Sequence, residues 1–281
     1  MGAVAEIERK LARGRCERET DGAPALRMST MTHLVWAPPA WVGRARRVLT
    51  GLAERHPART IFLVPLPGRR TEIETDATVH TFELGDGREA LSEVIEIRVR
   101  GHAARHPASL ALPLLISDLP VFCRWRGRPD WHGSAFSELV GVVERLVVDS
   151  SEWPGLPGAY RNLAGVFDRV ATSDIAWRRA LPWRVALAGL WPGIRKARRV
   201  TVEGPRADAL LLEGWLHSRL PRRISVSRRD AEVLRAVWVD GEPIDPAPSP
   251  PIHPSDLLSA ELDVYVRDPV YEAAVLAAAA R

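Results

Sequence analysis

The chain has 281 residues, of which 46% are apolar and 26% charged, a composition typical of folded globular proteins and not of disordered ones. No apolar stretch approaches the roughly 20 residues of a membrane-spanning helix, and the N-terminus lacks a signal-peptide core, so we expect a cytoplasmic protein without membrane contact. The net charge of +4 is spread along the chain and does not predict nucleic-acid binding.

Cysteine usage agrees with a reducing compartment. Cys16 and Cys123 are the two cysteines of the chain, which excludes a disulfide framework and a four-cysteine zinc site. Cys123 lies in an apolar run and is interpreted as inert core, whereas Cys16 lies in a charged segment where a redox role stays open.

The first part of the chain alternates strand and helix patterns. Residues 1–27 are interpreted as an N-terminal arm with a short helical segment and a linker. Strands are then predicted at 32–36, 60–64, 79–84, 94–99, 119–125 and 146–149, with helices at 41–55, 103–115 and 136–144. This alternation predicts an α/β domain over residues 28–155, a doubly wound and mostly parallel sheet covered on both faces.

The Pro- and Gly-rich residues 151–158 are the expected domain boundary. A smaller α+β domain is predicted for residues 159–281. Its helices are expected at 159–170, 173–190, 207–220 and after Pro269, and its strands at 199–203, 223–227, 233–239 and 260–266. The proline-rich residues 239–254 are expected to form an exposed loop.

The first strand–helix turn decides against a nucleotide site. In doubly wound enzymes this turn is rich in glycine, so that backbone amides can approach phosphates. Residues 37–40 are Ala-Pro-Pro-Ala, with no glycine and with two residues that carry no amide proton. We therefore expect neither a dinucleotide fingerprint nor a P-loop, and no bound cofactor.

Other candidate chemistry is incomplete. His102 and His106 have metal-binding spacing on a helix, but no glutamate lies between them, so a surface pair is the favoured interpretation and no metal site is expected. The segment 132–134 contains a histidine and a serine without a Gly-x-Ser-x-Gly elbow. Asp118 and Asp149 lie at strand ends, where carboxylates serve catalysis or, more commonly, turns and caps. The chain is therefore not expected to be an enzyme.

Tryptophan and arginine recur together in both predicted domains. Indoles anchor protein interfaces, and guanidinium groups stack on them or bind carboxylates and phosphates. Internal stacking between the domains is an equally open interpretation. The candidates for a partner interface or an anion site are Arg124, Trp125, Arg126, Trp177, Arg178, Trp183, Arg184 and Trp215.

Several segments in order carry a resemblance to a known family. They are residues 27–34, 56–60, 117–122, 124–127, 145–150, 174–178, 182–184 and 214–216. With these segments the chain resembles the glucose-6-phosphate dehydrogenase assembly protein OpcA family over about residues 5–270. One departure is that Arg124 precedes Trp125, where relatives often have paired tryptophans.

The resemblance implies a non-catalytic factor that binds glucose-6-phosphate dehydrogenase and promotes its assembly or active oligomer. Such a factor acts as an allosteric activator and controls carbon entry into the oxidative pentose phosphate pathway. The alternative hypothesis is a sugar-phosphate or nucleotide sensor, or a degenerate transferase, in which Arg178 and Arg184 hold an anion such as a sugar-phosphate effector.

Overall fold

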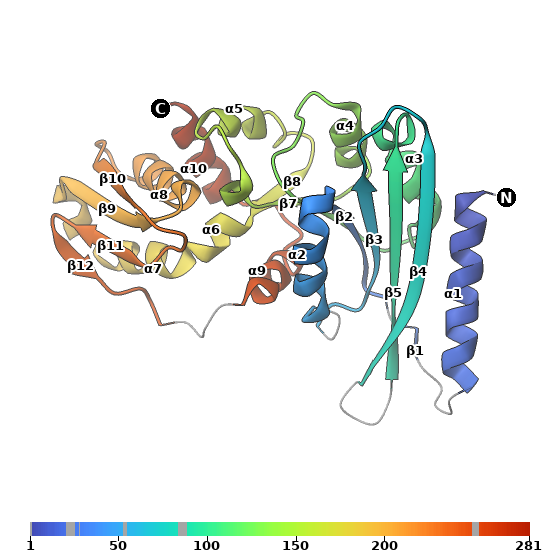
Figure 1. Cartoon of the computed structure of the whole chain (residues 1–281). Coiled ribbons are helices and arrows are strands. Elements are labelled where there is room, and N and C mark those ends of the chain that lie inside the picture. The colour runs from blue at the N-terminus through green and yellow to red at the C-terminus, as the bar shows by residue number, and fades with distance from the viewer. Residues whose placement is uncertain (1, 21–25, 28, 53–54, 84–88, 249–252) are drawn as a thin grey trace. The chain divides into compact units, whose positions relative to one another are not determined.

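The computed structural model describes residues 2–20, 26–27, 29–52, 55–83, 89–248 and 253–281 (Figure 1). The chain divides into two compact units. Unit 1 comprises residues 1–147 and 254–265, and unit 2 comprises residues 148–253 and 266–281. Within the described ranges, none of the helices has the length and apolar character needed to cross a bilayer.

Unit 1 is built on a mostly parallel sheet. Its strands follow the order β1-β5-β3-β2-β6-β7, and β4 pairs antiparallel with β5. The strands are β1 (Leu26–Arg27), β2 (Met31–Trp36), β3 (Ala58–Pro65), β4 (Glu72–Glu83), β5 (Glu89–Arg100), β6 (Val121–Trp125) and β7 (Arg145–Val148). The α/β class and the mostly parallel sheet expected from the sequence are confirmed.

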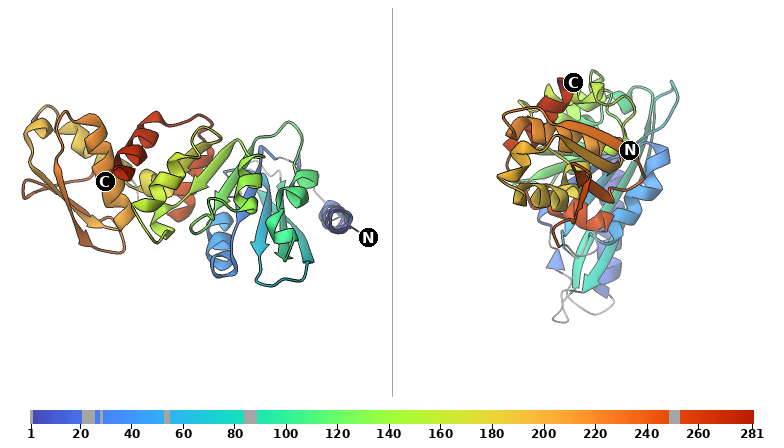
Figure 2. Two further views of the ribbon diagram at one scale, coloured as in Figure 1. Left: turned by 90° about the horizontal axis from the view of Figure 1, so that it is seen from above. Right: turned by 90° about the vertical axis from the view of Figure 1, so that its left-hand side faces the viewer.

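Helices cover both faces of this sheet. Helix α2 (Pro39–Thr50) lies on one face, where its Arg46 pairs with Glu96 of β5. Helix α1 (Ala3–Thr20) lies on the other face, where its Arg15 approaches Glu93 of β5 at 3.5 Å. Residues 93 and 96 point to opposite faces because side chains alternate along a strand. Figure 2 shows α1 end-on beside the sheet.

The N-terminal segment is part of the core of unit 1. The sequence suggests only a short helical stretch in an arm, but α1 has 18 residues and packs against β4. Ile7 and Leu11, four residues apart on one helical face, are fully buried. The shorter elements of unit 1 are the 3₁₀ helices η1 (Ala103–Arg105) and η2 (Leu112–Leu114), and the helices α3 (Ala108–Ala111) and α4 (Ser134–Val140).

The strand predicted at residues 260–266 is wrong. The chain forms helix α9 (Pro254–Leu262), which belongs to unit 1, although the sequence assigns it to the second domain. Proline in the first turn and Asp256 favour a helix start. Leu257, Leu258 and Leu262 are buried at helical spacing, and two of them lie before the segment for which a strand is predicted.

Unit 2 contains a smaller sheet with the strand order β10-β9-β11-β12. These strands are β9 (Arg199–Gly204), β10 (Ser225–Asp230), β11 (Ala236–Val239) and β12 (Glu242–Ile244). Strand β12 pairs antiparallel with β11 inside the segment expected to be a loop. A short strand, β8 (Ala171–Asp174), precedes helix α6 and includes residues 173–174, which were expected to be helical. The predicted domain boundaries themselves stay predictions.

Helices of unit 2 pack on this sheet and on one another. They are η3 (Ser150–Glu152), α5 (Gly158–Ala164), α6 (Ile175–Arg179), α7 (Leu181–Gly189), η4 (Gly193–Lys196), α8 (Arg206–Arg219) and α10 (Pro269–Ala279). Leu187 of α7 and Leu212 of α8 are buried in one apolar cluster with Val200 and Val202 of β9. Helices α8 and α10 lie side by side (Figure 2).

Gly214 sets the close approach of α8 and α10. A Cβ atom added there would lie 2.1 Å from the carbonyl oxygen of Ala274, which is backbone and cannot move aside alone. We expect Gly214→Ala to lower the free energy of unfolding of the protein by about 1–3 kcal/mol, because the two helices must separate. Urea denaturation followed by circular dichroism measures this change.

Gly189 provides the matched control. A Cβ atom at Gly189, the last residue of α7, meets nothing within 4 Å. Gly189→Ala should leave stability unchanged or raise it by up to about 1 kcal/mol through reduced chain entropy. Equal effects of the two substitutions would contradict the proposed helix contact.

Candidate functional site

The carboxyl edge of the unit 1 sheet is where a doubly wound fold places a ligand. Strands β2 and β6 are neighbours, but β2 leads through α2 to β3 on one side and β6 leads through α4 to β7 on the other. Such a reversal of strand order opens a crevice at the carboxyl ends of the two strands. Here the two strands end at Trp36 and Trp125.

Aromatic side chains cluster at these strand ends. The rings of Trp36 and Trp125 are stacked with centroids 4.8 Å apart and an interplanar angle of 17°. Phe136 meets Trp125 edge-on at 5.1 Å, and Trp131 meets Phe136 in the same way at 5.4 Å. Trp125 keeps only 3% of its surface exposed. A buried tryptophan stack therefore forms at the carboxyl ends of the two strands.

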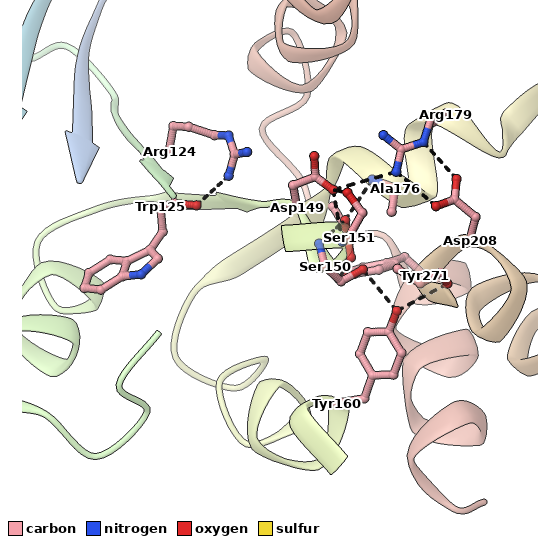
Figure 3. Close-up of polar contacts among 12 residues, drawn as sticks. Arg124, Trp125, Asp149, Ser150, Ser151, Tyr160, Ala176, Arg179, Asp208 and Tyr271 are labelled. Atoms are coloured by element: carbon pink, nitrogen blue, oxygen red, sulfur yellow. Dashed lines mark hydrogen bonds and ion pairs between the residues drawn. The ribbon is translucent and has the colours of Figure 1, made fainter. Parts of the chain in front are cut away.

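The arginines beside Trp125 are also buried. The Arg126 guanidinium lies 4.8 Å above the Trp41 ring, and the Arg126 amide donates to the Trp36 carbonyl at 2.9 Å. The Arg124 guanidinium donates to the Trp125 carbonyl (Figure 3). The structure thus brings the predicted residues Arg124, Trp125 and Arg126 together, inside unit 1 and away from solvent.

The turn into α2 offers no cradle for phosphate. Pro38 and Pro39 carry no amide proton, and the Trp41 amide donates to the Pro38 carbonyl at 2.8 Å. The helix N-terminus therefore lacks the free donors that bind phosphate in nucleotide-binding folds.

The predicted residues of unit 2 fall into separate positions. Trp177 is buried, its indole donates to Asp268 at 2.9 Å, and the Arg184 guanidinium lies 3.3 Å from its ring centroid. Trp183, 7% exposed, belongs to the apolar core of unit 2, against which the half-buried Trp215 packs. Arg178 is half-buried. The structure brings Trp177 and Arg184 together and engages Arg184 internally.

A buried polar cluster lies in the same unit (Figure 3). The Asp174 carboxylate accepts from the amides of Ala176 at 2.8 Å and Ser150 at 3.0 Å, and the Tyr271 hydroxyl lies 3.4 Å from it. The hydroxyls of Ser150 and Tyr160 are 3.0 Å apart. Burial, and then the nearby Asp149 charge, raises the pKa of Asp174 to about 7.

Arg179 balances the charge of this cluster. Its guanidinium makes two bonds to Asp208, at 2.8 and 3.0 Å, and lies 3.8 Å from Asp149. Asp149 also accepts from the Ser151 amide at 3.2 Å and caps η3. Asp149, which the sequence places at a strand end, therefore has a capping role. Because Asp174 is fully buried, its hydrogen bonds join segments within unit 2.

The remaining sequence candidates have ordinary environments. The rings of His102 and His106 lie 4.3 Å apart, and His106 Nδ1 lies 2.6 Å from Glu138. Across the described residues, no three metal-ligating side chains gather. Burial raises the pKa of Cys123 to about 12, which keeps its thiol protonated. Asp118 occupies a turn with φ of 65°.

An exposed apolar patch on unit 2 was missed by the sequence reasoning. Helix α7 and the turn after it expose Leu181, Val185, Leu190 and Trp191, which we call the α7 patch. Trp191 is 59% exposed, and the Arg195 guanidinium lies 5.4 Å from its ring centroid. The four-residue spacing of Leu181 and Val185 was the available signal. Trp177 and Trp183 matched the Trp-Arg pattern better, but they are buried.

Comparison with known proteins finds a partial similarity to one family. Residues 50–165 match the family model described as the glucose-6-phosphate dehydrogenase subunit N-terminal domain. Through this segment the chain is similar to the OpcA family. The OxPP cycle protein OpcA of Nostoc punctiforme is 27% identical over 186 residues, which cover 62% of this chain and 40% of that protein. The protein of the same name from Synechocystis is 25% identical over 138 residues, 46% of this chain and 29% of that protein.

The OpcA match covers part of the proteins involved. The chain aligns with less than half the length of these relatives, and no solved structure matches it significantly. The family segment begins at the end of α2 and contains Arg124, Trp125, Arg126 and the Asp149 turn. It ends before Trp177 and the α7 patch.

Asp174 predicts a pH dependence of stability. With a folded pKa near 7 and an ordinary unfolded value of 3.8, the folded state retains a proton that the unfolded state has lost between about pH 4 and pH 7. Stability from this group is therefore complete below pH 4 and is lost as pH rises to 7, by about 1.4 kcal/mol per unit at most. The stability difference between wild type and Asp174→Asn should fall between pH 5 and 7 and then level off.

Urea unfolding of both proteins at half-unit intervals from pH 5 to 8 measures this difference. Asp240 is an exposed aspartate whose pKa is lowered by hydrogen bonds from the amides of Arg199 and Arg198. For Asp240→Asn the same difference should be flat, because the carboxylate is ionised throughout the range. A flat difference for Asp174→Asn would mean that Asp174 is ionised at pH 5.

Proposed function

We propose that this chain has no catalytic activity of its own, binds glucose-6-phosphate dehydrogenase and promotes the active oligomer of that enzyme. The chain would thereby control the flow of carbon into the oxidative pentose phosphate pathway. The similarity to a family model named after this dehydrogenase, and to relatives named OxPP cycle protein OpcA, supports the partner and the pathway.

The filled carboxyl edge of unit 1 carries the argument against catalysis. A doubly wound enzyme needs room at the ends of β2 and β6 for substrate or cofactor. The stacked rings of Trp36 and Trp125 make these strand ends part of the core, and Pro38 and Pro39 carry no amide proton for phosphate. A scaffold with this edge closed supports a role in binding another protein.

The α7 patch is the contact surface that we propose for the dehydrogenase. Tryptophan and arginine are enriched among the residues that dominate binding energy at protein interfaces. The exposed indole of Trp191, with Arg195 beside it and an apolar stripe on α7, has this character. The indoles of Trp125, Trp177 and Trp183 are buried, so we assign them to the packing of their own units.

Activation follows if the patch binds one assembly state better than another. A factor shifts an equilibrium only by the difference in its affinity for the two states. A surface formed across two dehydrogenase subunits would give such a difference, since it exists only in the oligomer. The factor would then raise the fraction of active enzyme without entering its active site.

Substitution of the exposed and the buried tryptophan separates binding from folding. Trp191→Ala should weaken binding to the purified dehydrogenase about 10- to 100-fold in calorimetry and leave the unfolding transition unchanged, as for an interface anchor. Trp183→Ala, a core truncation, should lower the free energy of unfolding by about 3–5 kcal/mol.

The dehydrogenase assay tests the proposal as a whole. Addition of this chain should raise dehydrogenase activity and shift the enzyme to its larger assembly in light scattering. If Trp191→Ala binds the dehydrogenase as tightly as the wild type does, the contact surface does not lie on α7. Failure of the wild-type chain to bind or activate the enzyme, or turnover of glucose 6-phosphate by the chain alone, would contradict the assembly role.

A further inference from the structure

A cavity of about 590 Å³ lies on the α2 face of the sheet in unit 1. Its floor is formed by residues of β2, β3, β4 and β5, and its walls by α2 and by Leu262 of α9. The volume lies within the range of small-molecule binding sites in proteins, roughly 300 to 1,000 Å³. Neither the sequence patterns nor the proposed partner contact accounts for it.

The strand register places three uncharged polar side chains in one row on the floor, with a valine among them. His33 pairs with Thr60, Thr60 with Val94, and Val94 with Thr78, so these four residues form one line across β2, β3, β5 and β4. Apolar side chains surround the row: Met31, Phe62, Leu49 and Leu52 line the same cavity. The floor thus combines an apolar surface with a few uncharged donors and acceptors.

His33 is the unusual member of this row. Its side chain is 1% exposed, and within the described residues neither of its ring nitrogens has a hydrogen-bond partner. Buried polar atoms without partners are rare, because each loses its hydrogen bonds to water on folding. A residue that costs stability in this way is expected where a ligand satisfies it.

The charges around the cavity select the kind of ligand. Burial, and then repulsion from Arg124 and His56, lowers the pKa of His33 to about 3, so the imidazole is neutral at physiological pH. The guanidinium of Arg46 at the wall is paired with Glu96. Asp76 lies 3.8 Å from Lys10. The floor therefore presents no cation of the kind that binds phosphates or carboxylates.

We propose that this cavity binds an uncharged planar heterocycle whose edge carries one hydrogen-bond donor and one acceptor. A neutral imidazole offers one donor and one acceptor, so such an edge satisfies His33. Leu49, Leu52 and Leu262 from the walls, with Phe62 from the floor, would pack on the ring faces. The site is separate from the α7 patch and stands whether or not the chain binds the dehydrogenase.

Benzimidazole and indene form a matched pair of probes. They have nearly the same bicyclic shape, but benzimidazole carries one donor and one acceptor nitrogen, and indene carries neither. We expect saturable binding of benzimidazole to the full chain at pH 7.5, with a dissociation constant of about 1 mM or lower, as for a small fragment in a fitted site. Indene should bind at least tenfold more weakly, and the anion benzoate should not bind.

His33→Leu tests the role of the imidazole. The substitution replaces the polar imidazole with an apolar side chain of similar volume. The cavity therefore remains, but the hydrogen bonds to a ligand are lost. The tenfold preference for benzimidazole over indene should disappear in this variant. In the wild type, ¹⁵N spectra of histidine-labelled protein should show the His33 ring nitrogens shifting as benzimidazole is added, while His217 in unit 2 stays unchanged.

A second pair of variants blocks the cavity from its exposed side. Thr78 lines the cavity and is exposed on β4, so Thr78→Trp should fill the space without altering the core and abolish binding. Glu74 lies on the same face of β4 but outside the cavity lining. Glu74→Trp should bind benzimidazole as the wild type does.

Three results would overturn the proposal. One is the absence of saturable benzimidazole binding up to several millimolar in the folded wild type. Another is equal benzimidazole affinity in the wild type and Thr78→Trp, which would place binding elsewhere. The third is tighter binding of benzoate than of benzimidazole, which would make the cavity an anion site.

Discussion

The stack of Trp36 on Trp125 is the contact on which the character of unit 1 depends. The two residues are register partners at the carboxyl ends of β2 and β6, so the sheet itself brings their rings to the point where strand order reverses. Two indoles bury more area than any other pair of side chains, and stacking adds roughly 0.5–1.5 kcal/mol to that burial. The carboxyl ends of β2 and β6 are thereby part of the hydrophobic core of unit 1.

The arginines of the Trp-Arg segments pack inside the units as the tryptophans do. In both units the guanidinium groups of the Trp-Arg segments turn inward: Arg126 lies over Trp41, and Arg184 lies over Trp177. An arginine stacked on an indole and bonded to a carbonyl contributes to packing as much as to charge. In these pairs the arginine covers a large aromatic ring that is buried near polar backbone groups. The Trp191–Arg195 pair differs because the Trp191 side chain is exposed.

The sequence predicts the strands of the parallel sheet well, because β3 and β6 are continuous apolar runs buried on both faces, a pattern with one structural solution. It predicts Trp125 and Arg126 as neighbours but not their burial, because exposure depends on contacts such as Trp36 and Trp41 that are distant along the chain. The α9 segment fails for a related reason: residues 260–266 fit a strand period, and the helix is selected by packing of Leu257 and Leu258 in unit 1. The cavity is invisible in sequence, since its floor is assembled by register across four strands.

Two buried ionisable groups show how environment separates a packing role from a binding role. Asp174 is fully buried, yet two backbone amides donate to it and a tyrosine hydroxyl lies close, so its cost of burial is offset within unit 2. His33 is equally buried, but within the described part of the chain its ring nitrogens have no hydrogen-bond partner. Both pKa shifts favour the neutral form and arise mainly from burial, so the shift alone does not tell the two residues apart. The hydrogen-bond inventory does: a satisfied group holds its own neighbours together, whereas an unsatisfied one at the floor of a cavity is preorganised for a molecule from outside.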